Sequence, residues 1–260
     1  DGITVASTHE TTAAMRDTET DAGPVTLASD DGDPSSTGEP VDPSSTGEPV
    51  DPDLLVWLSF DDAAAPFADA SGNARDGACE APQCPTSLPT DSGGMLHFDG
   101  IDDRLSIAND EALQAPSALT LAAWIEVDAL ALPTYQDVIA KTYGDSNSNS
   151  WGIGFPNDST ALRMVMHDGT AVLTIGTIEW PGGAHHVAGT WDGALARLYL
   201  DGVSIGEVEL AAIAADTHAV LIGADVNAEL EGNYFGGTLD DLRIYQRALA
   251  EDEILALAAR

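Results

Sequence analysis

One loop of the sequence combines aromatic and hydrogen-bonding side chains in the way that sugar-binding sites do. Tyr143 and Trp151 stand at its two ends, and Asp145, Asn147 and Asn149 lie between them. An aromatic ring stacks on a pyranose, while carboxylates and amides hydrogen-bond its hydroxyls. The loop therefore predicts a glycan-binding site. The alternative is a plain connection between strands, because Trp151 also begins a predicted strand where it can be buried.

A pair of carboxylates invites a catalytic reading. Glu126 and Asp128 alternate along one predicted strand, which puts both on one face. Glycosidases use two carboxylates as acid and nucleophile. A third acid is missing because Ala131 takes its place, and no Ser or Cys nucleophile stands in a motif. We therefore expect a protein that is not an enzyme and has no catalytic residues; a divergent glycoside hydrolase is the third alternative.

The net charge excludes two classes of partner. The chain has 44 acidic and 9 basic residues, which gives a formal net charge of −35. Phosphate groups would be repelled, so we expect neither nucleic acid nor an anionic membrane surface as partner. No apolar run has the length that a membrane span requires, so we expect no membrane insertion of the chain.

The cysteines indicate an oxidising compartment. Cys79 and Cys84 are the only two, and four residues separate them. Two ligands without a nearby His are too few for a structural zinc site. A local disulfide that closes a surface loop fits better, and a reduced thiol pair is the alternative. The chain also begins at Asp1 without an initiator Met, which is typical of a processed secretory protein.

Residues 1–53 differ in texture from the rest. They lack hydrophobic periodicity, and the unit DPSSTGEPV runs from Asp33 to Val41 and again from Asp42 to Val50. Such a segment cannot bury enough apolar area to offset the entropy of ordering. It is predicted to be a disordered acidic linker rich in Pro, Ser and Thr, of the kind found between a surface anchor and a folded module in secreted bacterial proteins.

Residues 54–260 read as one all-β domain. Short segments rich in Val, Ile, Leu, Tyr and Trp alternate with Gly, Asp and Asn clusters, which predicts an antiparallel two-sheet sandwich followed by one short helix. In that helix, Ala250–Ala259, we expect Ile254 and Leu255 to face inward. The predicted strands are Leu54–Phe60, Met95–Phe98, Arg104–Ile107, Leu119–Val127, Asp137–Lys141, Trp151–Phe155, Ala161–Met166, Val172–Ile175, His186–Trp191, Leu195–Leu200, Val203–Glu209, Ala219–Ile222 and Tyr234–Tyr245.

A series of motifs carries a family resemblance. The segment from Gly236 to Leu249 reads GGTLDDLRIYQRAL. Others precede it in order: LSFDD from Leu58, DASGN from Asp69, LHFDGIDD from Leu96, LTLAAW from Leu119, HHVAGTWDG from His185, LYLDG from Leu198 and LIG from Leu221. Together they resemble the laminin-G-like jelly-roll domains of the concanavalin A-like lectin and glucanase class. The resemblance implies a jelly roll over residues 54–260.

The same resemblance implies a structural calcium ion. In such domains the ion ties an N-terminal loop to the last strand through carboxylates and backbone carbonyls, a ligand set that suits a hard cation. By position, the matching residues are Asp61 or Asp69, the carbonyls around Gly72 and Asn73, and Asp240. The plain alternative is that Asp69 caps a turn and Asp240 is solvated at a sheet edge.

The predicted function is binding at the outside of a cell. A second polar loop, Asp225–Asn233, contributes Asn227 and can lie beside the first loop in a jelly roll. We expect a secreted or cell-surface module that binds an extracellular glycan, with calcium as a structural cofactor. A protein-binding adhesion module without a glycan pocket is the alternative.

Overall fold

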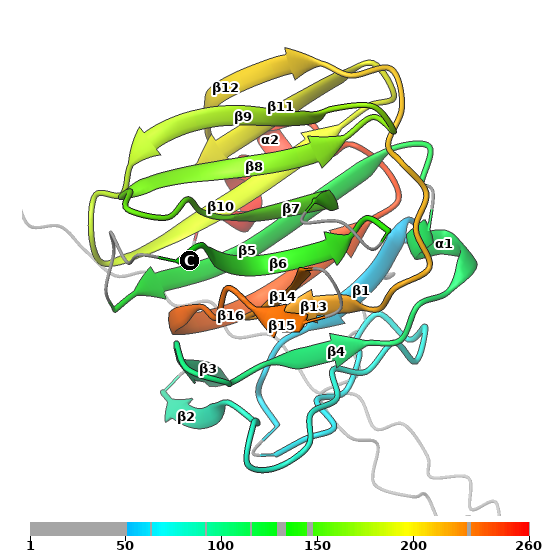
Figure 1. Cartoon of the computed structure of the whole chain (residues 1–260). Helices are drawn as coiled ribbons and strands as arrows, with labels where there is room; N and C mark the ends of the chain where they lie inside the picture. The colour runs from blue at the N-terminus through cyan, green and yellow to red at the C-terminus, as the bar shows by residue number, and fades with distance from the viewer. Residues whose placement is uncertain are drawn as a thin grey trace, which may run out of the picture. The chain divides into compact units, whose positions relative to one another are not determined.

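The computed structural model describes residues 51–62, 64–91, 93–114, 116–128, 134–144, 148–227 and 230–259 (Figure 1). The repeated unit predicted to form a linker lies outside the described residues, and so do Asp145 and Asn147. In the described part of the chain, the strands form two large antiparallel sheets that stack face to face, as the sequence predicted. No described helix has the length and apolar character needed to span a bilayer.

The larger sheet has eight strands in the order β12, β11, β10, β5, β16, β3 and β2, with β1 also paired to β16. Their bounds are β1 Leu54–Leu58, β2 Thr86–Thr90, β3 Gly93–Asp99, β5 Leu119–Val127, β10 Ala184–Trp191, β11 Leu195–Leu200, β12 Val203–Glu209 and β16 Gly236–Tyr245.

The smaller sheet has six strands in the order β4, β13, β6, β7, β8 and β9, and a separate hairpin joins β14 to β15. In Figure 1 this hairpin lies beside β13 and β6. The bounds are β4 Leu105–Ile107, β6 Gln136–Thr142, β7 Asn149–Phe155, β8 Ala161–His167, β9 Val172–Glu179, β13 Val220–Ile222, β14 Asp225–Asn227 and β15 Leu230–Gly232. The helices are α1 Glu111–Gln114 and α2 Glu251–Leu257.

The alternation of side chains along the strands builds the core between the two sheets. On β7, Trp151, Ile153 and Phe155 are all buried in this core. The sheets approach closely because β10 carries a glycine where they meet: a Cβ at Gly189 would lie 2.4 Å from Sδ of Met164. Residues between the inward ones on β7 and β8 consequently point to the other face of the smaller sheet.

Two turns illustrate how the sequence sets the hairpins. Asp201 and Gly202 join β11 to β12 with φ values of 49° and 78°, the left-handed region that a two-residue hairpin turn of this hand requires. Asp192-Gly193 joins β10 to β11. Both Asp-Gly pairs thus lie in connections between paired antiparallel strands.

A second, smaller apolar cluster lies between α2 and the other face of the larger sheet. Ile254 of the helix packs there with Leu54, Tyr199 and Tyr245. The inward orientation predicted for Leu255 is wrong, since 56% of this residue is exposed. Successive residues of a helix point about 100° apart around its axis. When Ile254 faces the sheet, Leu255 therefore points away from it into solvent.

The structure adds elements that the sequence pattern did not predict. Strand β2 is mostly exposed and contains Pro89, which suits an edge strand. It therefore lacks the alternation of apolar and polar residues by which a strand is predicted. Strands β14 and β15 have three residues each and α1 has four, too few for any periodicity to show. Strand β1 ends two residues earlier than predicted, before Phe60, whose φ of 57° leaves the extended region.

Candidate functional site

A pocket of about 590 Å³ opens on the outward face of the smaller sheet, beside the β14–β15 hairpin. Polar residues dominate its lining, and they come from four strands and the adjoining loops. The residues are Tyr135, Asp137, Ser148, Asn149, Arg163, Val165, Val172, Asp225, Asn227 and Asn233.

Glycines on β7 make room for this pocket. Gly154 alternates with the buried Ile153 and Phe155, so it belongs to the outward face. A Cβ at Gly154 would lie 2.4 Å from the carbonyl oxygen of Gln136 and 3.0 Å from Oδ1 of Asp137. The side chain of Asp137 therefore occupies space that only a glycine on the neighbouring strand leaves open.

Sheet register brings the two acidic residues of the pocket together. Strand β13 pairs with β6 so that Ile222 lies opposite Ile139. Asp225 follows β13 by three residues, and Asp137 precedes Ile139 by two. Because the strands are antiparallel, these two positions extend toward the same end of the sheet, and both side chains line the pocket.

Both carboxylates are buried and held in place by hydrogen bonds. Each residue is 2% exposed. Nδ2 of Asn233 donates to Oδ2 of Asp137 at 2.9 Å. Oδ1 of Asp225 accepts from the backbone N–H of Val226 at 2.7 Å and from Oγ1 of Thr142 at 3.2 Å. The two acids therefore cannot swing out to solvent without breaking these bonds.

Burial also changes how these acids titrate. Loss of hydration raises the pKa of both carboxyls well above the ordinary value, and the charge of Asp225 raises that of Asp137 further. The guanidinium of Arg163 acts in the opposite direction on both. The pair consequently retains a proton at a pH where surface carboxylates are fully ionised.

One buried donor and one buried acceptor in the pocket find no hydrogen-bond partner among the described residues. The donor is Nε of Arg163, whose guanidinium carbon lies 4.7 Å from the ring centroid of Tyr135. The acceptor is Oδ1 of Asn149, a residue that is 7% exposed and hydrogen-bonds Asp225 through its side chain. Buried polar atoms are almost always paired, so these two indicate a place where a ligand or water completes them.

The residues predicted to bind a ligand separate in the structure. Asn149 and Asn227 line the pocket together, so the two polar loops do meet there. Tyr143 instead stacks on His167, with ring centroids 4.2 Å apart. Trp151 is fully buried in the core, so its ring cannot stack on a ligand at the surface. Asp145 and Asn147 lie outside the described residues.

The sequence reading missed most of the pocket. It placed Asp137 inside a predicted strand and singled out Asn227 rather than Asp225 from the second loop. A usable signal was present: in Trp151-Gly152-Ile153-Gly154-Phe155 every second residue lacks a side chain, which is unusual for a strand. Such a pattern indicates that something else approaches the outward face.

Asp69, one of the predicted calcium ligands, already makes several hydrogen bonds with the backbone. Both carboxylate oxygens of Asp69 accept backbone N–H groups, from Trp57 and Ser71 at Oδ1 and from Arg75 at Oδ2. Burial acts to raise the pKa of Asp69, and these hydrogen bonds hold it below its ordinary value. Asp69 therefore caps a turn, the plainer of the two readings from the sequence.

Other residues of this set and the neighbouring carbonyl of Leu55 also take part in hydrogen bonds. The carbonyl of Leu55 accepts from Nδ2 of Asn73 at 3.2 Å and from a guanidinium nitrogen of Arg75 at 2.9 Å. Asp61 accepts the backbone N–H of Gly94 at 2.8 Å. Gly72 donates its N–H to the carbonyl of Asp69, and Asp240 accepts that of Asp241. Calcium binding by these residues stays a prediction, and in this arrangement the oxygens of Asp69 would first have to give up their N–H donors.

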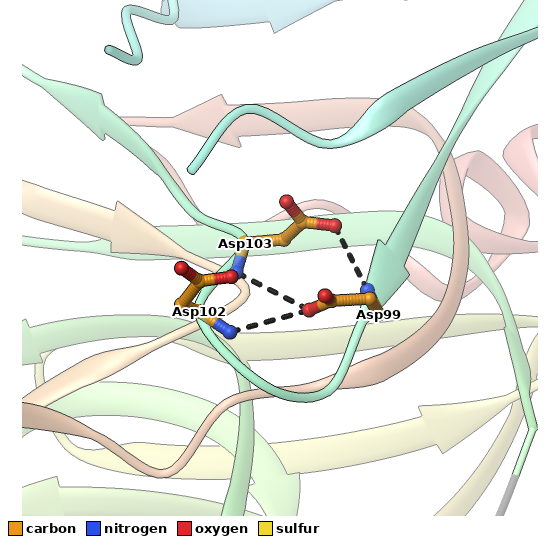
Figure 2. A group of neighbouring side chains, drawn as sticks. All are labelled: Asp99, Asp102 and Asp103. Carbon is orange, nitrogen blue, oxygen red and sulfur yellow. Dashed lines mark hydrogen bonds between the residues drawn. The ribbon is translucent and has the colours of Figure 1, made fainter. Parts of the chain in front are cut away.

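Within the described residues, one group of three acids has ligand atoms within 4.8 Å of one another: Asp99, Asp102 and Asp103. Figure 2 shows that these side chains close a turn by their own hydrogen bonds. Oδ1 of Asp99 accepts the N–H of Ile101 at 2.8 Å and that of Asp102 at 3.2 Å, while Oδ2 of Asp103 accepts the N–H of Asp99 at 2.9 Å. The turn explains the cluster without an ion.

The acids considered for catalysis lie elsewhere. Glu126 is exposed on β5 of the larger sheet, and Oδ2 of Asp128 is 2.8 Å from Nε2 of His97. Neither lines the pocket. The predicted disulfide between Cys79 and Cys84 is present.

The chain belongs to the concanavalin A-like lectin/glucanases superfamily, whose family model matches residues 99–255. This confirms the resemblance seen in the sequence motifs. None of the curated proteins matches the sequence.

Solved structures with the same fold include binding domains. The binding domain of Paraclostridial Mosquitocidal Protein 1 has a TM-score of 0.63 at 18% identity, and the receptor binding domain of botulinum neurotoxin D has 0.61 at 13%. Each comparison covers 79% of this chain and 52% of the toxin domain, so the chain spans about half the length of these relatives.

A third similar structure is nearly the same size as the domain described above. It is domain 4 of AbnA, a GH43 extracellular arabinanase from Geobacillus stearothermophilus, in complex with arabinotriose, with a TM-score of 0.60 at 18% identity. The match covers 79% of this chain and 98% of that one. At these identities the likeness establishes a shared fold.

Proposed function

We propose that this chain is an extracellular module that binds carbohydrate, without cleaving it, in the pocket on the smaller sheet. The observation that carries the proposal is the pair of unpartnered buried atoms, Nε–H of Arg163 and Oδ1 of Asn149, in one pocket. A hydroxyl group is both donor and acceptor. Sugar hydroxyls therefore offer the acceptor that the first atom needs and the donor that the second needs.

The rim of the pocket suits the rest of a sugar ring. Tyr135 and Val172 both line the pocket and are 37% and 44% exposed, so each offers apolar surface to the C–H face of a sugar ring. The amides of Asn227 and Asn233 add further hydrogen-bonding groups on the side of the hairpin. A mostly pre-formed pocket with apolar rim and a few fixed polar groups is typical of small-ligand sites.

Two further observations support binding outside the cell. The Cys79–Cys84 disulfide persists in an oxidising compartment. The arabinanase domain of the same fold is part of an extracellular enzyme and is in complex with an oligosaccharide. The toxin domains of this fold are named as binding domains.

A protein partner is the second candidate, and the receptor binding domain among the similar structures favours it. Isolated glycans separate the two functions. The full chain is applied to an array of oligosaccharides and polysaccharides, and binding to defined glycans is expected. Binding only to whole protein receptors, with silence on every glycan, would replace the proposal by protein-mediated adhesion.

One variant assigns the binding to the pocket. Asn149→Ala removes the unpartnered oxygen and should lower glycan affinity about tenfold or more, the order expected for a lost buried hydrogen bond. Asn157→Ala is the matched control, since Asn157 is exposed in the turn between β7 and β8. Equal loss in both variants, or none in either, would place the site elsewhere.

A further inference from the structure

We infer that the pocket selects uncharged sugars and rejects sugars that carry a carboxylate, and that Asp137 and Asp225 are the selecting residues. This inference rests on the proposed function, because it names the class of sugar that the same pocket accepts.

The first ground is the position of the two acids. Both line the pocket, both are 2% exposed, and each is fixed by hydrogen bonds from neighbouring groups. A negative charge on a ligand in this pocket would face this pair of acids, which cannot turn away and carries at least one negative charge at neutral pH. Repulsion between charges is strong where water is excluded, because little solvent screens it.

The second ground is the balance of charge. Arg163 is the basic residue of the pocket lining, and its charge already acts on Asp137 and Asp225. An acidic sugar would bring three carboxyl groups to one guanidinium, whereas a hydroxyl adds no charge. The formal charge of −35 on the whole chain repels an approaching anion as well.

The third ground is the chemistry of the unpartnered atoms. Oδ1 of Asn149 needs a donor, and an ionised carboxylate has none to offer. Only Nε of Arg163 would gain from an anion, and the guanidinium is held over the ring of Tyr135. A hydroxyl can donate to Oδ1 of Asn149 or accept from Nε of Arg163, whereas a carboxylate in its place can only accept, so a hydroxyl suits this part of the pocket better than a carboxylate does.

The test compares matched probes on the full chain. Oligosaccharides of galactose, glucose and arabinose are measured against oligogalacturonate, glucuronate-bearing and sialylated oligosaccharides of similar length by calorimetry at neutral pH. Uncharged probes are expected to bind at least tenfold more tightly than acidic ones. Equal or tighter binding of the acidic probes would overturn the inference and leave the proposed function intact. Silence with both classes would overturn the proposed function itself.

Three substitutions test the residues. Asp225→Asn and Asp137→Asn keep the shape of the side chain and remove its charge. Either variant should lower the ratio of the affinity for uncharged probes to the affinity for acidic probes. Arg163→Gln should widen this ratio. The control, Asp252→Asn, changes an exposed acid in α2 and should leave the ratio unchanged. A ratio that is unaltered in both Asp variants, or narrowed by Arg163→Gln, would show that the two acids do not select. Near-ultraviolet circular dichroism verifies the fold of each variant.

Discussion

Asn233 donates a hydrogen bond of 2.9 Å from its Nδ2 to Oδ2 of Asp137, a residue 96 positions earlier in the chain. The bond joins the segment after the β14–β15 hairpin to the beginning of β6. It also satisfies one oxygen of a carboxylate that has almost no contact with water. A second bond joins the same two residues, since the backbone N–H of Asp137 donates to the carbonyl oxygen of Asn233 at 2.9 Å, so one wall of the pocket is attached to its floor by two hydrogen bonds.

Removal of the side-chain amide of Asn233 should destabilise the fold. Asn233 has a φ of 55°, so Asn233→Gly is the suitable change because glycine keeps the left-handed conformation without strain. The variant leaves a buried carboxylate oxygen without its donor, which costs about 1–3 kcal/mol in the free energy of unfolding. Urea unfolding at pH 7 measures it. Asn157→Gly, in an exposed turn, is the control. Equal losses of stability in both variants would mean that the introduction of glycine, and not the lost hydrogen bond, causes the effect.

The pH dependence of stability should change in Asp137→Asn. Burial raises the folded-state pKa of Asp137 from 3.8 to about 7. Between these values the folded protein holds a proton that the unfolded chain releases, so the stability of the wild type falls as pH rises through this window. Asparagine carries no such proton. The variant should therefore gain on the order of 1–3 kcal/mol relative to the wild type between pH 5 and pH 8.

Urea unfolding midpoints at the two pH values measure this difference. Asp252→Asn, on the exposed surface of α2, should keep the slope of the wild type. A parallel pH profile for wild type and Asp137→Asn would show that this carboxyl is ionised at its ordinary pKa in the fold.

Gly154→Ala should damage both stability and the pocket. The added Cβ would lie 2.4 Å from the carbonyl oxygen of Gln136, so β6 and β7 would have to separate. Such overpacking costs about 1–3 kcal/mol, and displacement of Asp137 should also weaken glycan binding. Gly232→Ala is the matched control, because a Cβ there meets nothing within 4 Å. Thermal melting measures the stability of both variants, and calorimetric titration measures their glycan affinity. A Gly154→Ala variant with the stability and affinity of the wild type would contradict the close approach of β6 and β7.

The calcium prediction is tested by melting the protein in calcium and in excess chelator. Because N–H donors occupy the oxygens of Asp69 and a guanidinium contacts the carbonyl of Leu55, we expect equal melting temperatures. An ion bound only by the folded state must raise the melting temperature. A rise that Asp69→Asn abolishes would mean that this loop rearranges to bind calcium, as the family resemblance implies.

The strands could be predicted from the sequence because alternation is a local property. Leu119–Val127, Leu195–Leu200 and Val203–Glu209 have the predicted bounds. In the first two, apolar residues recur at every second position, and the Asp201-Gly202 turn separates the last two. The jelly-roll class followed from motifs that recur in order along the chain, and the family match over residues 99–255 confirms it.

The pocket could not be predicted in the same way. Asp137 and Asp225 meet only because β13 pairs with β6 in one register, and a single sequence does not determine which strands become neighbours. Trp151 failed as a ligand residue for a related reason. Its position in the inward series of β7, with Ile153 and Phe155, decides its burial, and the preceding polar loop gave no information about that series.

The glycine at position 154 has a consequence for the thermodynamics of binding. Where other pockets are floored by side chains that change rotamer when a ligand arrives, part of this floor is the main chain of a paired strand. Main chain that is already ordered in a sheet loses little further freedom on contact with a ligand. This part of the pocket therefore has its bound shape before the ligand arrives, so the conformational entropy lost on binding comes mainly from the ligand.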